Sequence, residues 1–115
     1  MPGCVLRVIA SEFPLPNGLL TTRTRNGGFL CSVSDADGNA FKTQVLDAQS
    51  FLSEHAAALS VAAKSPGFNA ELDFGVWTVA PDAMSKSFSF PQSLLILAAT
   101  CGVALTVSVY HAADS

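Results

Sequence analysis

The stretch from Ser93 to Ser115, SLLILAATCGVALTVSVYHAADS, decides the class of the whole protein. Between Leu94 and Ala113 it holds no formal charge, over a span close to the roughly 20 residues that a membrane helix needs. Its periodicity, however, changes at Gly102. Before this glycine the apolar residues recur at helical spacing, and after it they alternate with other residues in steps of two. The sequence therefore predicts a short helix capped by Gly102 and a half-buried strand that follows it.

A single membrane helix over Leu94 to Ala113 is the alternative interpretation. Membrane helices are normally flanked by Lys or Arg, which set their orientation. The basic residue closest to this stretch is Lys86, which lies well upstream of Leu94. A membrane helix also has no reason to change its period at a glycine. We therefore expect no membrane association.

Upstream of this stretch the sequence predicts two strands, a hairpin and a long helix. The expected elements are a strand within residues 4–13, a hairpin within 19–34 that turns at 26–28, a helix over about 39–64 and a strand within 69–79. Asn39 is the expected helix cap, and Lys64 followed by Ser-Pro-Gly marks the helix end. A strand over residues 39–45 is the alternative for the start of the helix. We prefer the helix because its apolar period continues unbroken to residue 62.

This order of elements predicts an α+β fold in one domain, residues 1–115. We expect a two-layer sandwich, in which two helices cover one face of a mostly antiparallel sheet of about five strands. The hairpin strand that carries Arg23 and Arg25 is expected at a sheet edge. The uncovered sheet face is expected to carry five polar residues: Arg7, Glu71, Asp73, Thr106 and Ser108.

The composition favours a protein that binds other proteins. Hydrophobic residues make up 50% of the chain and charged residues 13%, against roughly 25% charged in an average soluble domain. With six basic residues and a net charge of −3, the chain lacks the basic patch that nucleic-acid binding needs. We therefore expect a second copy or another protein as partner, and no nucleic acid.

The cysteines and the first residues favour the cytoplasm. Cys4, Cys31 and Cys101 show no spacing that would hold zinc, and their apolar surroundings are typical of buried, reduced thiols. Residues 1–10 have no basic segment before their apolar run, and Arg7 interrupts that run, so they are not expected to act as a secretion signal. We expect no metal and no cofactor.

Asp35 and Asp37, in the string DADGN, are weak candidates for calcium binding. A calcium loop of the EF-hand type needs a glutamate six residues after its glycine, and that position holds Gln44. A helix-capping turn explains the string better.

His55 lies on the apolar face of the long helix and His111 near the last residues, and neither has a nucleophile or an orienting acid beside it in the sequence.

Glu71 and Asp73 are the more interesting acidic pair. They are expected on the same face of one strand, where two neighbouring carboxylates can raise one another's pKa and work as acid and base. Ordinary solvated carboxylates on an open sheet face are the other interpretation. The sequence does not choose between the two, and no residue is assigned a catalytic role.

Four blocks of the chain resemble a bacterial family of small hypothetical proteins, a domain of unknown function. The blocks are VLRV at residues 5–8, SDAD…Q…DA…FL at 34–52, LDFG at 72–75 and FP…LL.LA…G..L..S.Y at 90–110. The resemblance implies a soluble α+β fold that includes the last helix and strand. Some similar proteins neutralise toxins as immunity-type partners. The connection VWTVAPDAMSKSFS is less charged here than in the family, which puts any site that uses it in doubt.

The resulting hypothesis is a non-enzymatic protein-interaction module, either a homodimer or an immunity-like binding partner. Its contact residues would come from the open sheet face, the hairpin edge and the start of the long helix: Arg7, Arg23, Arg25, Asp35, Asp37, Glu71, Asp73, Thr106, Ser108 and Tyr110. The alternative hypothesis is a small enzyme or ligand-binding domain that uses the carboxylates of the open sheet face, with Arg7 beside them.

Overall fold

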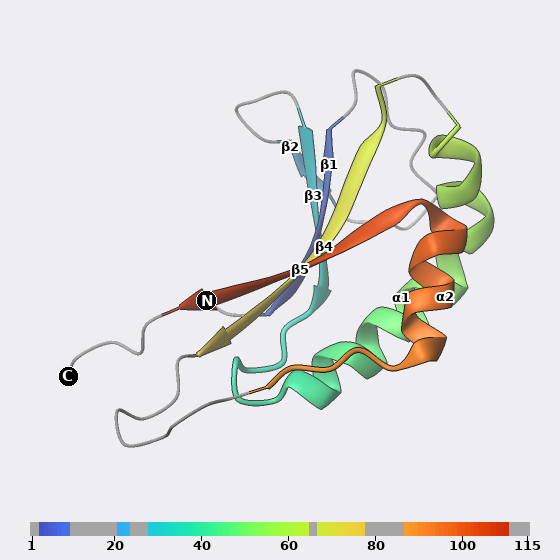
Figure 1. Cartoon of the computed structure of the whole chain (residues 1–115). Coiled ribbons are helices and arrows are strands. Elements are labelled where there is room, and N and C mark those ends of the chain that lie inside the picture. The colour runs from blue at the N-terminus through green and yellow to red at the C-terminus, as the bar shows by residue number, and fades with distance from the viewer. Residues whose placement is uncertain (1–2, 10–20, 24–27, 65–66, 78–86, 111–115) are drawn as a thin grey trace.

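The computed structural model describes residues 3–9, 21–23, 28–64, 67–77 and 87–110, which form one sheet and two helices. In chain order the elements are β1 (Cys4–Ile9), β2 (Thr21–Arg23), β3 (Gly28–Ser34), α1 (Phe41–Ala62), β4 (Asn69–Trp77), α2 (Gln92–Cys101) and β5 (Val103–Tyr110). Both helices lie on the same face of the sheet (Figure 1). The predicted α+β class, with two helices on one face, is confirmed.

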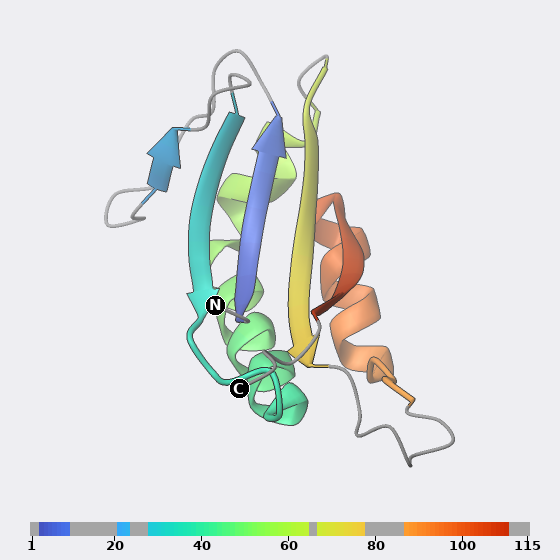
Figure 2. The ribbon, with the colours of Figure 1, turned by 90° about the vertical axis from the view of Figure 1, so that its left-hand side faces the viewer.

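The strands are ordered β2-β3-β1-β4-β5. β1 runs antiparallel to both β3 and β4, and β2 runs antiparallel to β3 as the predicted hairpin requires. β5 runs parallel to β4, so the sheet is mixed, and the sequence analysis had foreseen no parallel pair. The cause is α2, since a helix that crosses between two strands returns the chain to the same end of the sheet. α1 lies behind β1 and β3, and α2 lies behind β5 at the edge (Figure 2).

The boundary between α2 and β5 falls at Gly102, as the change of period predicted. Gly102 has a φ of 72°, in the left-handed region, and its backbone N–H reaches the carbonyls of Ala98 and Ala99 at the end of the helix. A left-handed cap of this kind ends a helix and turns the chain into the next element. Neither described helix combines the length and the apolar character needed to cross a membrane.

The long helix α1 begins at Phe41, which favours the helical interpretation of residues 41–45 over the strand. The predicted cap at Asn39 is wrong, because the helix is capped by Ala40 and no side chain bonds its first turn. Asn39 instead lies in a turn that is closed by a bond from the Ala40 N–H to the Asp37 carbonyl. The helix is bent at His55, whose backbone angles are not helical. Residues 87–90, before α2, form neither helix nor strand.

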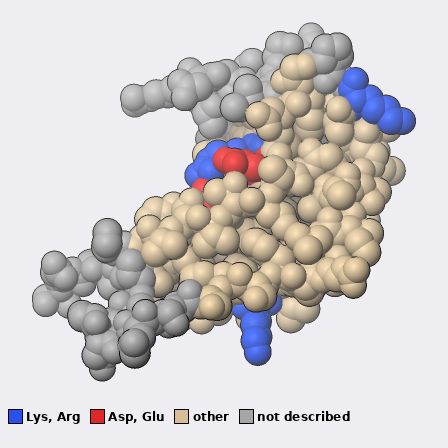
Figure 3. All heavy atoms as spheres, in the orientation of Figure 1, with Lys and Arg blue, Asp and Glu red and all other residues tan. Residues whose placement is uncertain are grey.

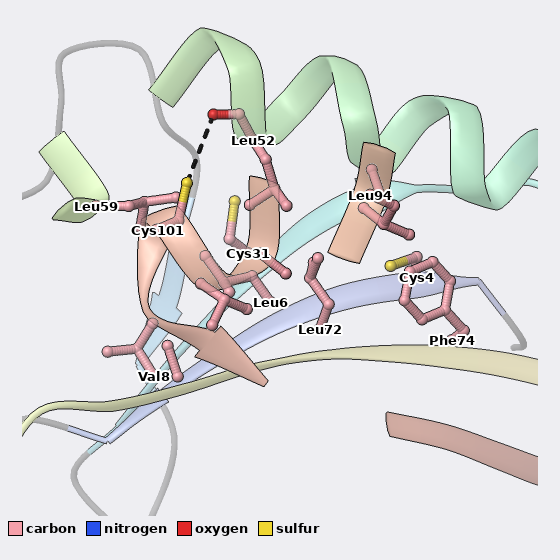
Figure 4. Packing of buried hydrophobic residues seen from close by; sticks show 14 of the residues in the cluster. Cys4, Leu6, Val8, Cys31, Leu52, Leu59, Leu72, Phe74, Leu94 and Cys101 are labelled. Atoms are coloured by element: carbon pink, nitrogen blue, oxygen red, sulfur yellow. Dashed lines mark hydrogen bonds between the residues drawn. The ribbon is translucent and has the colours of Figure 1, made fainter. Parts of the chain in front are cut away.

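The hydrophobic core fills the space between the sheet and the two helices. Figure 4 shows its main contributors: Cys4, Leu6 and Val8 from β1, Leu72 and Phe74 from β4, Leu52 and Leu59 from α1, and Leu94 and Cys101 from α2. Phe74 is fully buried, and its ring meets those of Phe41 and Phe90 at 5.8 and 5.1 Å. The residues of β1 and β4 that alternate with these contributors face the other side of the sheet, where the polar residues lie.

All three cysteines are buried free thiols, and their burial has a consequence at alkaline pH. Burial, assisted by the negative charges of Asp73 and Asp47, raises the pKa of Cys4 to about 12 from its ordinary value of 9.0. The folded protein thus keeps this proton to a higher pH than the unfolded chain does. The stabilisation is complete below pH 9.0 and is lost as the pH rises toward 12, by about 1.4 kcal/mol per pH unit.

We therefore expect the free energy of unfolding to fall steeply between about pH 9 and about pH 12. The fall should be shallower in a Cys4→Ala variant, although not absent, because burial also raises the pKa values of Cys31 and Cys101. Urea unfolding of both proteins at several alkaline pH values measures the two slopes. Equal slopes would show that Cys4 contributes nothing to the alkaline loss.

Candidate functional site

Five polar side chains lie together on the sheet face that the helices leave open. We call them the polar cluster: Arg7 on β1, Glu71 and Asp73 on β4, and Thr106 and Ser108 on β5. The strand register brings them together, because it sets Arg7 opposite Glu71 and Asp73 opposite Thr106. The alternation of each strand places all of them on one face. Figure 3 shows acidic and basic atoms meeting on the side of the molecule away from the helices.

Every carboxylate oxygen of the polar cluster accepts a hydrogen bond. Arg7 Nη1 donates to Glu71 Oε1 at 3.0 Å and to Asp73 Oδ2 at 2.6 Å. Thr106 Oγ1 donates to Glu71 Oε2 at 2.8 Å, and Ser108 Oγ donates to Asp73 Oδ1 at 2.6 Å. The cluster is therefore a closed network that ties β1, β4 and β5 together.

Burial within the polar cluster is uneven. The Asp73 side chain is only 4% exposed, whereas those of Arg7 and Glu71 are 43% and 36% exposed. Asp73 is thus not the solvated carboxylate that one interpretation of the sequence expected. Burial tends to lower the pKa of Arg7, but hydrogen bonds and the charges of Asp73 and Glu71 outweigh it and raise that pKa. Arg7 stays charged and compensates the buried carboxylate.

The geometry of the polar cluster gives little support to acid–base catalysis. A general acid or base must be within reach of a substrate, whereas Asp73 is almost fully buried and each of the four oxygens of Glu71 and Asp73 already accepts one hydrogen bond. Cys4 points to the opposite, helix-covered face and holds its proton. Among the described residues no three His, Cys, Asp or Glu side chains gather as a metal site would require.

A groove that does have the size of a ligand site lies elsewhere. It has a volume of about 490 Å³ between α1 and the segment before α2, and its apolar lining comes mainly from Phe41, Val45, Leu46, Phe90 and Pro91. None of the polar cluster lines it. A ligand site built on the carboxylates would need them to converge in such a pocket, so the groove does not support that hypothesis.

Asp35 and Asp37 lie in the loop between β3 and α1. One oxygen of Asp37, Oδ1, accepts bonds from the Gly38 N–H at 2.6 Å and from the Trp77 indole N–H at 2.8 Å. Asp37 thus shapes its own turn and holds it against the end of β4. Asp35 is exposed. No described contact joins either residue to the polar cluster.

The remaining candidates are scattered or outside the described residues. Arg23 ends β2, which is an edge strand as predicted, but its side chain is not described, and Arg25 and His111 lie outside the described residues. His55 packs on the Phe51 ring at 4.7 Å and comes within 3.8 Å of Glu54, an arrangement without a nucleophile. Tyr110 is exposed at the end of β5.

Gln44 is the structurally important polar residue that the sequence analysis missed. Its fully buried side chain donates from Nε2 to the carbonyl oxygens of Ala36, Asp37 and Gly75, at 3.2, 3.2 and 2.9 Å. It therefore fastens the loop before α1 to β4. Its place on the helix was the available indication, since a residue three positions after Phe41 and next to Val45 falls on the buried face.

Replacing Gln44 with leucine should lower the free energy of unfolding by about 2 kcal/mol, because the buried Gly75 carbonyl loses its donor. The loss is limited by one gain, since leucine also removes the Gln44 Oε1 atom, which is buried without a partner. Gln49, on the same helix but bonded only at the surface to Ser93, provides the control. Gln49→Leu should change the urea midpoint little, and a Gln44→Leu midpoint equal to it would contradict this role.

The outer side formed by α2, Gly102 and β5, here called the α2–β5 side, carries no formal charge. Residues 87–110 contain no Asp, Glu, Lys, Arg or His. Four of the six exposed large hydrophobic residues belong to this segment: Leu95, Ile96, Val109 and Tyr110. β5 is the last strand in the sheet, and no described strand pairs with its outer edge. This charge-free segment overlaps the stretch that decided the fold, from Ser93 to Tyr110.

A scan against protein-family models, a search of curated proteins and a search of solved structures found no match to this chain. The family resemblance of the sequence blocks therefore stays a prediction.

Proposed function

We propose that the protein is a non-catalytic interaction module that binds a protein through its α2–β5 side. The observation that carries the proposal is the combination of an edge strand that no described strand pairs with and a charge-free, partly apolar surface. Natural edge strands are normally protected from pairing by charged residues, proline or a bulge. β5 contains neither a charged residue nor a proline, and its pairing with β4 is regular over eight residues.

The polar cluster supports this role indirectly. Thr106 and Ser108 of β5 donate to the carboxylates of β4, and Arg7 of β1 holds those carboxylates in turn. The outer strand is therefore attached by side-chain bonds as well as by its backbone ladder. An edge that is already rigid loses less conformational entropy when a partner binds, which favours affinity.

The alternative, a small enzyme or ligand-binding domain, has weaker support because its proposed carboxylates are paired with Arg7 and accept hydrogen bonds from Thr106 and Ser108. An immunity-type role, in which the partner is a toxin, is one form of the interaction proposal and rests on the family resemblance alone. A cytoplasmic location accompanies the proposal, since three buried free thiols suit a reducing compartment.

Charge-introducing variants test the proposal. Ile96→Lys and Val109→Lys place a charge on the α2–β5 side, and Val61→Lys places one on an equally exposed position of α1. The wild-type chain should retain a protein from an extract of its own organism, or associate with itself in sedimentation velocity. Both variants should lose that association and the Val61→Lys control should keep it. A wild-type chain that is monomeric and retains no protein would overturn the proposal, as would three variants that behave alike.

A further inference from the structure

We infer that the partner of the α2–β5 side is a second copy of this chain, whose β5 pairs antiparallel with the first around a twofold axis perpendicular to the sheet. This inference rests on the interaction role proposed above and names its partner. The two five-stranded sheets would then join into one continuous sheet, with all four helices on the same face.

The outer edge of β5 has the composition that strand pairing requires. Val103–Tyr110 is rich in β-branched residues and ends in an aromatic residue, and both types favour strands. Its eight residues extend over about 26 Å at the usual rise of a strand. No backbone hydrogen bond of the described structure joins its outer edge to another segment. Among the described residues the outer edge of β5 therefore offers a full ladder of donors and acceptors.

The absence of charge on β5 points to self-pairing. In a twofold antiparallel pair the strand faces its own sequence, so any charged residue near the centre would lie close to its own copy and repel it. β5 has no such residue. A partner of different, charged sequence would find no charge on this edge to pair with, whereas a second copy presents the same apolar and hydroxyl side chains.

The alternation of β5 restricts the register of the pair. With the axis perpendicular to the sheet, residues opposite each other must face the same side, so one residue lies opposite its own copy. The register with Val107 at the centre sets Val109 opposite Leu105 and Tyr110 opposite Ala104 of the second copy. Val109 is 56% exposed and Tyr110 45%, and this register covers both. On the open face it sets Thr106 opposite Ser108, and because both hydroxyls already donate to Glu71 and Asp73, this pair adds packing contact rather than a new hydrogen bond.

The helix behind β5 enlarges the contact. α2 lies behind β5 at the same edge of the sheet (Figure 2), so the α2 helices of the two copies approach each other on the helix side. Leu95 and Ile96 are its exposed apolar residues. The contact would be about 26 Å long, the length of β5, and about 20 Å deep, the depth of the sheet and helix layers together. This corresponds to on the order of 500 Å² per copy. The two copies would thus bury on the order of 1,000 Å² in total, which is at the lower limit for a specific interface.

Sedimentation velocity tests the dimer directly. The wild-type chain should sediment as a dimer at micromolar concentration, and Val109→Lys should weaken the association about tenfold or more, because it buries a lysine against Leu105 of the second copy. Val61→Lys, with a side chain that is 64% exposed on α1, should leave the association unchanged. Circular dichroism and the urea midpoint show that each variant is folded. A monomeric wild-type chain would overturn the inference.

A cysteine at the centre of the pair tests the geometry. Val107→Cys places two cysteines directly opposite each other, at a separation that a disulfide can span. Mild oxidation should convert most of this variant to a covalent dimer, while Val61→Cys should form no more than collisional product. The native thiols are buried and do not compete. A Val107→Cys yield no higher than that of Val61→Cys would overturn the proposed pairing.

The two proposals fail in different ways. If the wild-type chain is monomeric but retains another protein that Val109→Lys no longer binds, the second copy is the wrong partner and the interaction role stands. If the wild-type chain is monomeric and retains nothing, both proposals fail. If it dimerises and Val107→Cys forms the disulfide, both are supported.

Discussion

Replacing Arg7 with methionine is expected to lower the free energy of unfolding by about 3 kcal/mol. The change leaves the Asp73 carboxylate, 4% exposed, without the cation that lies 2.6 Å from it. Breaking a buried ion pair by removing one partner typically costs about 3 to 5 kcal/mol. The lower end applies because Arg7 is itself 43% exposed, and water can take over part of its role. Urea unfolding at neutral pH measures the loss.

A double variant separates the missing charge from the missing side chain. Arg7→Met combined with Asp73→Asn removes both charges and keeps a group that Ser108 can bond. It should recover a large part of the stability that Arg7→Met loses, since the buried charge is gone. Lys64→Met, at an exposed position just after α1, is the control and should change stability by less than about 0.5 kcal/mol. An Arg7→Met midpoint equal to that of the control would show that Asp73 does not depend on Arg7.

The composition of the polar cluster was predictable, but its burial was not. Alternation in steps of two is a local property of each strand. The sequence alone therefore predicted that Glu71 and Asp73 share one face of their strand, and that Thr106 and Ser108 share one face of theirs. The burial of Asp73 depends on how β1, β4 and β5 are aligned. Arg7 and Glu71 lie 64 positions apart in the chain, and no local pattern specifies that they face each other.

The direction of β5 and the start of α1 were decided by contacts distant in sequence. Periodicity identifies a strand but not the direction in which it runs, so the parallel pairing of β4 and β5 followed only from the path of α2. Asn39 was a reasonable helix cap by residue type. The loop is instead held by Asp37, which bonds the Trp77 indole 40 positions away, and the helix begins after Ala40.

The order of the strands identifies an edge for partner binding that differs from the one the sequence indicated. In the sequence, Arg23 and Arg25 indicate that the hairpin lies at a sheet edge, because basic residues are typical of edge strands. The opposite edge, β5, is identified only once the strands are placed in the sheet. The absence of charged residues from β5 is visible in the sequence. In a sequence alone, however, an uncharged stretch is typical of a protein core or a membrane helix as much as of a binding edge.

Gly102 offers the second large effect, and it tests the boundary that decided the fold. Replacing it with alanine should lower the free energy of unfolding by about 3 kcal/mol, for two reasons that add. Its φ of 72° is disfavoured for any residue with a Cβ, at a cost of about 1 to 2 kcal/mol. An added Cβ would also lie 2.5 Å from the Cβ of Ala63, so that α1 and α2 would have to move apart.

Gly67 separates these two reasons, because it has a similar φ of 78° and nothing within 4 Å of the position of an added Cβ. Gly67→Ala should therefore show the conformational cost alone, about 1 kcal/mol, and the difference between the two variants should report the clash with Ala63. The urea midpoints of the two alanine variants measure this difference. If both variants lose the same stability, the close approach of Gly102 to α1 is not part of the fold. A larger loss for Gly102→Ala means that this glycine does more than end α2, because it also lets the turn into β5 pass directly against the end of α1.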